Sequence, residues 1–192
     1  MKPIERAELL DLGAYEQIRQ RFMARVIEQK RARYVALGPN MTVLFENRDT
    51  VLMQIQEMLR TERITAEKAI EHELETYNEL VPGDSELSAT IFIEYPDREQ
   101  RERMLSELRG VDDKFFVEAA GERVPVVPDR RGTDPNRTMA VHYVKFSLTP
   151  AALGALESGR GPVSIGVDHA SYQAKTELSA ATLRSLQDDF ER

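Results

Sequence analysis

The residues of this chain that could perform chemistry are few, and several of them stand together in the segment VDHASY, residues 167–172. Asp168, His169 and Tyr172 follow an apolar run that is expected to form a strand, and sites often lie where strands end. A carboxylate, an imidazole and a phenol can exchange protons, and the first two can hold a metal ion. The segment is therefore a candidate polar site for a small enzyme or a metal-binding protein.

His142 could join this site, depending on how the strands are arranged. Alternation places His142 and His169 on the apolar faces of their strands. Parallel neighbouring strands would hold the two histidines roughly 20 Å apart at ~3.3 Å per residue, whereas an antiparallel pair would bring them to one end of the sheet. The alternative interpretation is that each histidine is partly buried and hydrogen-bonded for a structural reason.

Other metal or cofactor sites are hard to build from this sequence. The chain has no cysteine, which excludes thiolate nucleophiles, disulfides, iron–sulfur clusters and cysteine zinc sites. The third histidine, His72, is predicted on the solvent face of a helix, beside Lys68 and Glu75. The stretch Glu71-His72-Glu73 lacks the i, i+3 or i, i+4 pairing that helical metal motifs use. We therefore expect neither a bound metal nor a cofactor.

A second group of polar residues lies where a strand-like run meets a helix, in FENRDT, residues 45–50. Free N–H groups at a helix start can bind anions, but Asn47 or Asp49 can accept those bonds as a cap, and Glu46 adds negative charge. Arg48 is expected to pair with a flanking carboxylate. We interpret the segment mainly as a helix start in which Asp49 supports stability, with a polar interaction site as the alternative.

Met53, on the helix that follows, lies outside the apolar stripe of that helix and shares a face with Glu57 and Arg60. An apolar residue in such a place is commonly exposed without consequence. The alternative is that the helix is buried on a second side, by another helix or by another subunit of a homo-oligomer.

The first long helix is expected to have a basic outer face. Helical spacing of apolar residues predicts this helix from Tyr15 to about Leu37. Only Glu16 and Glu28 stand against its six basic residues, which are Arg19, Arg21, Arg25, Lys30, Arg31 and Arg33. Such a face is either solvated or matched by acidic neighbours in the same chain, and the alternative is a docking surface for an acidic partner.

The composition limits the classes of function further. With 192 residues, of which 41% are apolar, the chain can build a core and fold alone. A net charge of −7 with both signs mixed argues against proteins that coat nucleic acids or membranes, because these need a basic face. No stretch approaches the ~18 apolar residues of a membrane span, and acidic residues stand where a signal peptide would have its apolar core. We therefore expect a cytoplasmic protein that binds neither nucleic acid nor membrane.

Local patterns predict the elements that would position these residues. Helical spacing dominates residues 1–82, and alternation of apolar and polar residues dominates residues 83–192. We expect strands at 41–45, 87–95, 140–148 and 163–167, a hairpin at 115–128 that turns near Gly121, and a polar loop at 129–139. Further helices are expected at 50–63, 66–80 and 97–110, after Pro150, and from Ser179. The fold class is therefore α+β, a single domain whose helical part packs on a mainly antiparallel sheet with flanking helices.

Three segments carry a resemblance to a known family: GPNMTVLFENRDTVLMQIQEM, EHELETYNELVP and VDHASY. In these, and over nearly the whole chain, the sequence resembles DUF3501, an uncharacterised bacterial family catalogued only as a domain of unknown function. The resemblance implies neighbouring genes for rubrerythrin-like proteins and for iron–sulfur oxidoreductases of the heterodisulfide-reductase type, and so a redox or peroxide-stress setting. It implies no activity and no functional residues. The family has proline after the histidine of the last motif, where this chain has Ala170, so the rigid turn is not carried over.

These observations favour a non-enzymatic accessory or interaction protein in a cytoplasmic redox or peroxide-stress system. The reasons are the missing catalytic signature, the lack of cysteine, the basic first helix and the resemblance. Its implied partners are rubrerythrin-like or iron–sulfur redox proteins. The alternative is a small enzyme or metal-binding protein that uses Asp168, His169 and Tyr172, with His142 as a further candidate.

Overall fold

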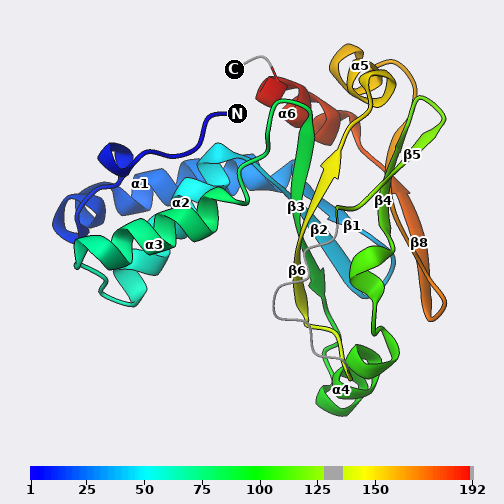
Figure 1. Cartoon of the computed structure of the whole chain (residues 1–192), viewed down its shortest axis with the longest axis horizontal. Helices are drawn as coiled ribbons and strands as arrows, with labels where there is room; N and C mark the ends of the chain where they lie inside the picture. The colour runs from blue at the N-terminus through cyan, green and yellow to red at the C-terminus, as the bar shows by residue number, and fades with distance from the viewer. Residues whose placement is uncertain (128–135, 191–192) are drawn as a thin grey trace.

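The computed structural model describes residues 1–127 and 136–190, and it has two antiparallel sheets packed face to face, with a helical arm beside them (Figure 1). Sheet A has the strand order β1-β2-β3-β6, and sheet B has the order β5-β4-β7-β8. The strands of sheet A are Tyr34–Ala36 (β1), Met41–Glu46 (β2), Glu86–Ile93 (β3) and Val141–Ser147 (β6). Those of sheet B are Glu122–Pro125 (β5), Phe115–Ala119 (β4), Val163–His169 (β7) and Tyr172–Glu177 (β8).

The core of this sandwich forms because successive side chains of a strand point to opposite faces of the sheet. Val43, Phe45 and Ile91 of sheet A share one apolar cluster with Val117 and Ile165 of sheet B, and all five are fully buried. The apolar positions that the sequence pattern picks out in these strands are therefore the ones that pack between the two sheets.

The two sheets are also joined along both of their edges. On one side Val127, just beyond β5, pairs with Lys145 of β6. On the other side side chains make the connection, because the Tyr172 hydroxyl of β8 donates to the Leu37 carbonyl at 2.7 Å, and the Thr176 hydroxyl donates to a carbonyl of β1. The sandwich is thus close to a closed barrel.

Short helices cover the two open ends of the sandwich (Figure 1). They are α4 (Arg98–Glu107) and the 3-10 turn η2 (Val111–Asp113) at one end, and α5 (Pro150–Ser158) and α6 (Ala180–Phe190) at the other. Leu105 and Leu108 are buried in the sandwich core from the α4 end, and Leu156 and Leu186 are buried there from the opposite end.

The helical arm projects sideways from sheet A (Figure 1). It consists of the 3-10 turn η1 (Arg6–Glu8), α1 (Leu12–Arg31), α2 (Arg48–Thr61) and α3 (Glu67–Asn78), with α2 packed against both of the other helices. The arm has its own apolar core, formed by Ile4, Leu9, Val51, Ile55, Leu59, Ile70, Leu74, Leu80 and Val81. In the described ranges, no helix combines the length and the apolar character that crossing a membrane requires.

The α+β class is confirmed, but the first helix is shorter than its spacing predicts. It ends at Arg31 rather than near Leu37, and the following residues form β1. The main-chain N–H of Phe45 donates to the Arg33 carbonyl at 3.1 Å, which draws this segment into sheet A. Strands β1 and β2 interrupt the mainly helical segment 1–82 and belong to the sandwich.

Strand β8 was not predicted by the sequence pattern. Its residues alternate between half-buried and exposed positions, and only Tyr172 and Ala174 are apolar, so the usual run of strand-forming apolar residues is missing. The other elements begin and end within a few residues of the expected positions. Most of the predicted polar loop, residues 129–135, lies outside the described residues.

Candidate functional site

The place where β2 leads into α2 joins the arm to the sandwich and brings several polar side chains together. We call it the joint and define it by Arg33, Glu46, Asn47, Thr50 and Asp189. All five residues are buried, although all five are polar or charged. Buried polar groups need partners, so the contacts at the joint decide what it can do.

Asn47 is the N-cap of α2. Its side-chain oxygen accepts a hydrogen bond from the Thr50 N–H at 3.0 Å, and the Thr50 hydroxyl accepts one from the Asn47 N–H at 2.9 Å. This reciprocal pair satisfies donors that a helix start leaves open. Of the two caps that the sequence allowed, the structure uses Asn47 rather than Asp49.

Glu46 is 3% exposed, yet both oxygens of its carboxylate have hydroxyl donors. The Thr90 hydroxyl donates to one oxygen at 2.6 Å, and the Thr50 hydroxyl donates to the other. Ser88 lies directly opposite Glu46 in the register of β2 and β3. Its buried hydroxyl has no hydrogen-bond partner among the described residues.

Arg33 fastens the C-terminal helix α6 to the joint. Its guanidinium is fully buried and donates to the Phe45 carbonyl at 2.7 Å and to the Asp189 carboxylate at 2.5 Å. The other oxygen of Asp189 accepts a bond from the Asn47 side chain at 3.1 Å. The prediction that Arg33 stands on a basic helix face is therefore wrong, because the residue lies beyond the helix and its charge is matched inside the protein.

Two hollows flank the joint. One has a volume of 150 Å³, and its walls include the acidic side chains of Glu46, Asp84, Glu86, Glu157 and Asp189. The other has a volume of 430 Å³ and is lined by Met1, Lys2, Asn47, Arg48 and Asp49. Burial alone would raise the pKa of Glu86, but the Gly83 N–H and the Lys145 ammonium outweigh burial and lower it. The acidic groups of the first hollow also have cationic partners, because the Met1 ammonium lies 3.3 Å from the Asp84 carboxylate and Arg33 pairs with Asp189. The first hollow is therefore lined by charges of both signs.

Arg48 and Asp49 bind residues far from the joint in sequence. Arg48 pairs with Glu8, not with a flanking carboxylate as the sequence pattern suggested, and this contact lowers the pKa of Glu8. Asp49 pairs with Arg25 of α1 at 3.2 Å. Both side chains thus tie α2 to the elements around it, which accords with a structural role for the helix start.

Met53 is half-buried, and its face of α2 is turned toward α1. On that face Glu57 accepts bonds from the Tyr15 hydroxyl at 2.8 Å and from two nitrogens of Arg19 at 2.8 and 2.9 Å. Burial, together with the Glu57 carboxylate, raises the pKa of Tyr15. The second side of α2 is therefore covered by another helix of the same chain.

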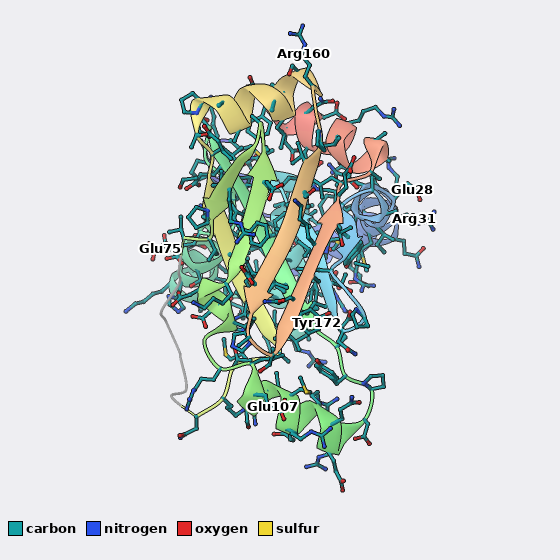
Figure 2. All side chains as sticks on the ribbon, turned by 90° about the vertical axis from the view of Figure 1, so that its right-hand side faces the viewer. Glu28, Arg31, Glu75, Glu107, Arg160 and Tyr172 are labelled. Atoms are coloured by element: carbon teal, nitrogen blue, oxygen red, sulfur yellow. The ribbon has the colours of Figure 1, made fainter. Side chains whose placement is uncertain are left out.

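The structure does not bring the side chains of the VDHASY segment together. Asp168 is on the outer face of sheet B, where it pairs with Arg123 at 3.2 Å. His169 is turned the other way, with Nε2 3.1 Å from the Arg109 carbonyl and Nδ1 accepting a bond from the Ser171 N–H. Tyr172, labelled in Figure 2 at the α4 end of β8, binds the Leu37 carbonyl across the edge of the sandwich.

His142 and His169 lie in different sheets but at the same end of the sandwich, beside α4. The Nε2 atom of His142 is 2.9 Å from both the Thr138 hydroxyl and the Met139 carbonyl, and the Thr138 N–H donates to the Leu105 carbonyl of α4. Burial lowers the pKa of His142, although the Met139 carbonyl and Asp112 act in the opposite direction. These contacts match the structural interpretation of both histidines.

The part of the chain that the structure describes contains no preformed metal site. There, no three side chains of His, Cys, Asp or Glu lie close enough together to hold an ion. His72 is exposed on α3, as predicted from its position on the helix.

The basic face of α1 is only partly matched within the chain. Four of its six predicted residues have carboxylate partners: Arg19 with Glu57, Arg25 with Asp49, Arg31 with Glu28, and Arg33 with Asp189. Arg21 and Lys30 form no ion pair among the described residues. Ile18 and Ile27 are each 46% exposed on the same helix. The outer side of α1 therefore combines unmatched charge with exposed apolar surface.

Sequence reasoning found Glu46, Asn47 and Thr50 at the start of α2 but missed Arg33 and Asp189, the other two residues of the joint. Arg33, Ser88, Thr90 and Asp189 carry no local signal of burial, because polar residues at such positions of strands and helices usually face solvent. The partner of Thr90 lies 44 residues away in the chain, and the partner of Asp189 lies 156 residues away. Only the folded arrangement brings them together.

Comparisons with known proteins place this chain beside others without an assigned activity. A family model described as "Protein of unknown function (DUF3501)" matches residues 3–190. A crystal structure described as a novel protein of unknown function from Burkholderia pseudomallei K96243 is 36% identical, with a TM-score of 0.91, and the match covers 98% of this chain and 99% of that one. No curated protein matches.

Proposed function

This chain belongs to the DUF3501 family of proteins of unknown function, and we propose that it is a non-enzymatic interaction protein whose helical arm docks an acidic partner. The docking surface is the basic edge of α1, which we define as Ile18, Arg21, Phe22 and Arg25. These residues follow the i, i+3, i+4, i+7 spacing that places side chains along one side of a helix.

The observation that carries the proposal is that this basic edge is exposed and that its charge is only partly matched. Arg21 is exposed and has no ion pair among the described residues. The side chain of Arg25 is 59% exposed even though it pairs with Asp49, and its guanidinium lies 5.3 Å from the centre of the Phe22 ring. Ile18, beside them, is 46% exposed. Cations around a small apolar area suit a partner that offers carboxylates around an apolar contact.

The side chains that could perform acid–base or metal chemistry also support a non-enzymatic role. His142, His169 and Tyr172 each make hydrogen bonds that hold one part of the fold to another. Asp168 is engaged by Arg123 on an open surface. An enzyme would need such groups to converge on a hollow, and these four do not.

The setting of this interaction is a prediction that rests on the family resemblance alone. It points to a redox or peroxide-stress system, with rubrerythrin-like or iron–sulfur redox proteins as partners. Exposed ion pairs contribute only ~0.2–1 kcal/mol each, so the binding is expected to be weak and sensitive to salt.

The test is capture of partners from a lysate of the native organism, followed by a binding measurement with the purified partner. We compare the parent chain, the variant Arg21→Glu/Arg25→Glu, and the control Arg98→Glu/Arg103→Glu, which makes the same charge change on α4. The parent and the control should bind an acidic protein that the basic-edge variant does not bind. Equal binding by all three, or no specific partner for the parent, would overturn the proposal. Unchanged oxidant tolerance after deletion of the gene would remove the redox setting.

A further inference from the structure

We infer that the acidic partner of the basic edge is a second copy of this chain, which presents the outer edge of its helix α3. The inference rests on the proposed function and names the chemistry of its partner. It predicts that the protein associates with itself through its helical arms.

The acidic edge of α3 consists of Glu67, Glu71 and Glu75, each one helical turn from the next. Glu67 is occupied by Arg6, whose Nε lies 2.6 Å from its carboxylate. Glu71 and Glu75 are exposed and form no ion pair in the described ranges. Like charges at i, i+4 on a helix repel each other, so a basic surface laid along this edge would relieve that repulsion.

The two edges are complementary in charge and in spacing. Helix α1 contains five basic residues against two acidic ones, whereas α3 contains four acidic residues against one basic one. Arg21 and Arg25 are four residues apart, as are Glu71 and Glu75, so each pair spans about 6 Å along its helix. Arg21 can therefore meet one carboxylate of the acidic edge, and Arg25, which stays 59% exposed beside Asp49, can meet the other. No change of register is needed.

The two edges also belong to helices on opposite sides of the molecule. Helix α2 packs between α1 and α3. Figure 2 shows Glu28 and Arg31 of α1 on one side of the molecule and Glu75 of α3 on the opposite side. The edges of one copy therefore cannot neutralise each other, but they can meet the edges of neighbouring copies.

This arrangement fixes the type of assembly. The contact joins two different surfaces, so it is heterologous, and each added copy leaves one edge of each kind unoccupied. Association should continue beyond two copies unless the angle between copies closes a ring. Ile18, which is exposed on the basic edge, would be covered in every such contact.

The experiment is analytical ultracentrifugation of the full chain over a wide concentration range at low and high salt. The parent should associate at ~0.01 M salt and dissociate at ~1 M, where the screening length falls from ~30 Å to ~3 Å. The basic-edge variant Arg21→Glu/Arg25→Glu and the acidic-edge variant Glu71→Arg/Glu75→Arg should each weaken association by about tenfold or more. The control Arg98→Glu/Arg103→Glu should behave like the parent.

Two further samples separate a direct contact from a general effect of charge. Mixing the two edge variants should restore association, because each supplies the edge that the other needs. The fourfold variant that carries both reversals should associate by itself. Circular dichroism and melting verify that each variant is folded, and Arg21→Ala replaces the double variant if that one is not.

The outcomes distinguish this inference from the proposed function. A parent that stays monomeric at low salt, or edge variants that associate like the parent, would overturn the inference. If the parent is monomeric but the basic-edge variant still loses a captured acidic protein, the proposed function stands and only the identity of the partner is wrong. If all variants capture the same proteins, the proposed function fails.

Discussion

The outer faces of the two sheets carry similar polar residues in opposite surroundings. On sheet A, Glu46 is covered by the arm and α6, and at the joint it lies beside Arg33 and Asp189, none of them more than 9% exposed. On sheet B, the side chains of Asp168 and Arg123 are each 52% exposed. One face is a buried polar layer between two parts of the fold, and the other is a surface in contact with water.

The comparison shows that burial, rather than residue type, decides what a charged pair contributes. An exposed pair contributes ~0–1 kcal/mol, because water competes for both charges. Removing one partner of a buried pair leaves a desolvated charge without compensation and costs ~3–5 kcal/mol. Polar residues on a strand are therefore weak evidence for a site until their exposure is known.

The largest effect is expected at the Arg33–Asp189 pair. Asp189→Ala leaves Arg33 buried without its carboxylate, so the free energy of unfolding should fall by ~3–5 kcal/mol. Urea denaturation of the parent and the variant measures the difference. The control is Asp189→Asn, which removes the charge but keeps a side-chain oxygen that can accept from Arg33, and it should be less destabilised than Asp189→Ala. A loss below ~1 kcal/mol in the single variant would mean that the joint is open to water.

The start of α2 should give a smaller effect that separates its two cap candidates. Asn47→Ala removes the N-cap bond from the Thr50 N–H and the bond to Asp189. It should lower the free energy of unfolding by ~1–2 kcal/mol. Asp49→Ala removes a partly exposed pair with Arg25 and should cost less than ~1 kcal/mol. Asp49→Asn, which keeps a side-chain oxygen, should melt close to the parent. If the Asp49 variants melt like the parent while partner binding collapses, the stretch is a recognition site.

The smallest effect is expected on the open face of sheet B. Asp168→Ala removes the pair with Arg123 and the bond from Gln173, and stability should change by less than ~1 kcal/mol. The midpoint of urea denaturation, compared at low and high salt, measures this change. Added zinc, iron or manganese should not alter melting of the parent. A stabilisation by one of these ions that Asp168→Ala abolishes would instead restore the metal-site alternative.

The sequence patterns predicted most of the elements because the signals for them are local. Apolar alternation marks Ile91 and Ile93 on β3, and the change from strand to helix is marked by Asn47. Strand β1 is only three residues long and follows a helical pattern without a break, so its neighbours in sheet A rather than its own residues determine it. Propensity is overridden there by the tertiary context.

The candidate site was predictable only in part for the same reason. The polar segment around Glu46 and Asn47 is visible in the sequence, but no residue near Arg33 or Asp189 indicates that these two side chains form a pair. Asp168 and His169 are neighbours in sequence, which made them attractive as a pair, yet successive residues of a strand point to opposite faces. Adjacent positions in a strand are therefore poor candidates for one site, because their side chains lie on opposite faces of the sheet.

The pairing of Arg33 with Asp189 also has a consequence for folding during translation. The two residues are 156 positions apart, and a ribosome adds ~5–20 residues per second, so the carboxylate follows the guanidinium by roughly 8 to 30 s. During that interval Arg33 has been synthesised, but Asp189, its carboxylate partner in the folded protein, has not. The arm and the sandwich cannot lock together in their native form before residue 189 has been translated.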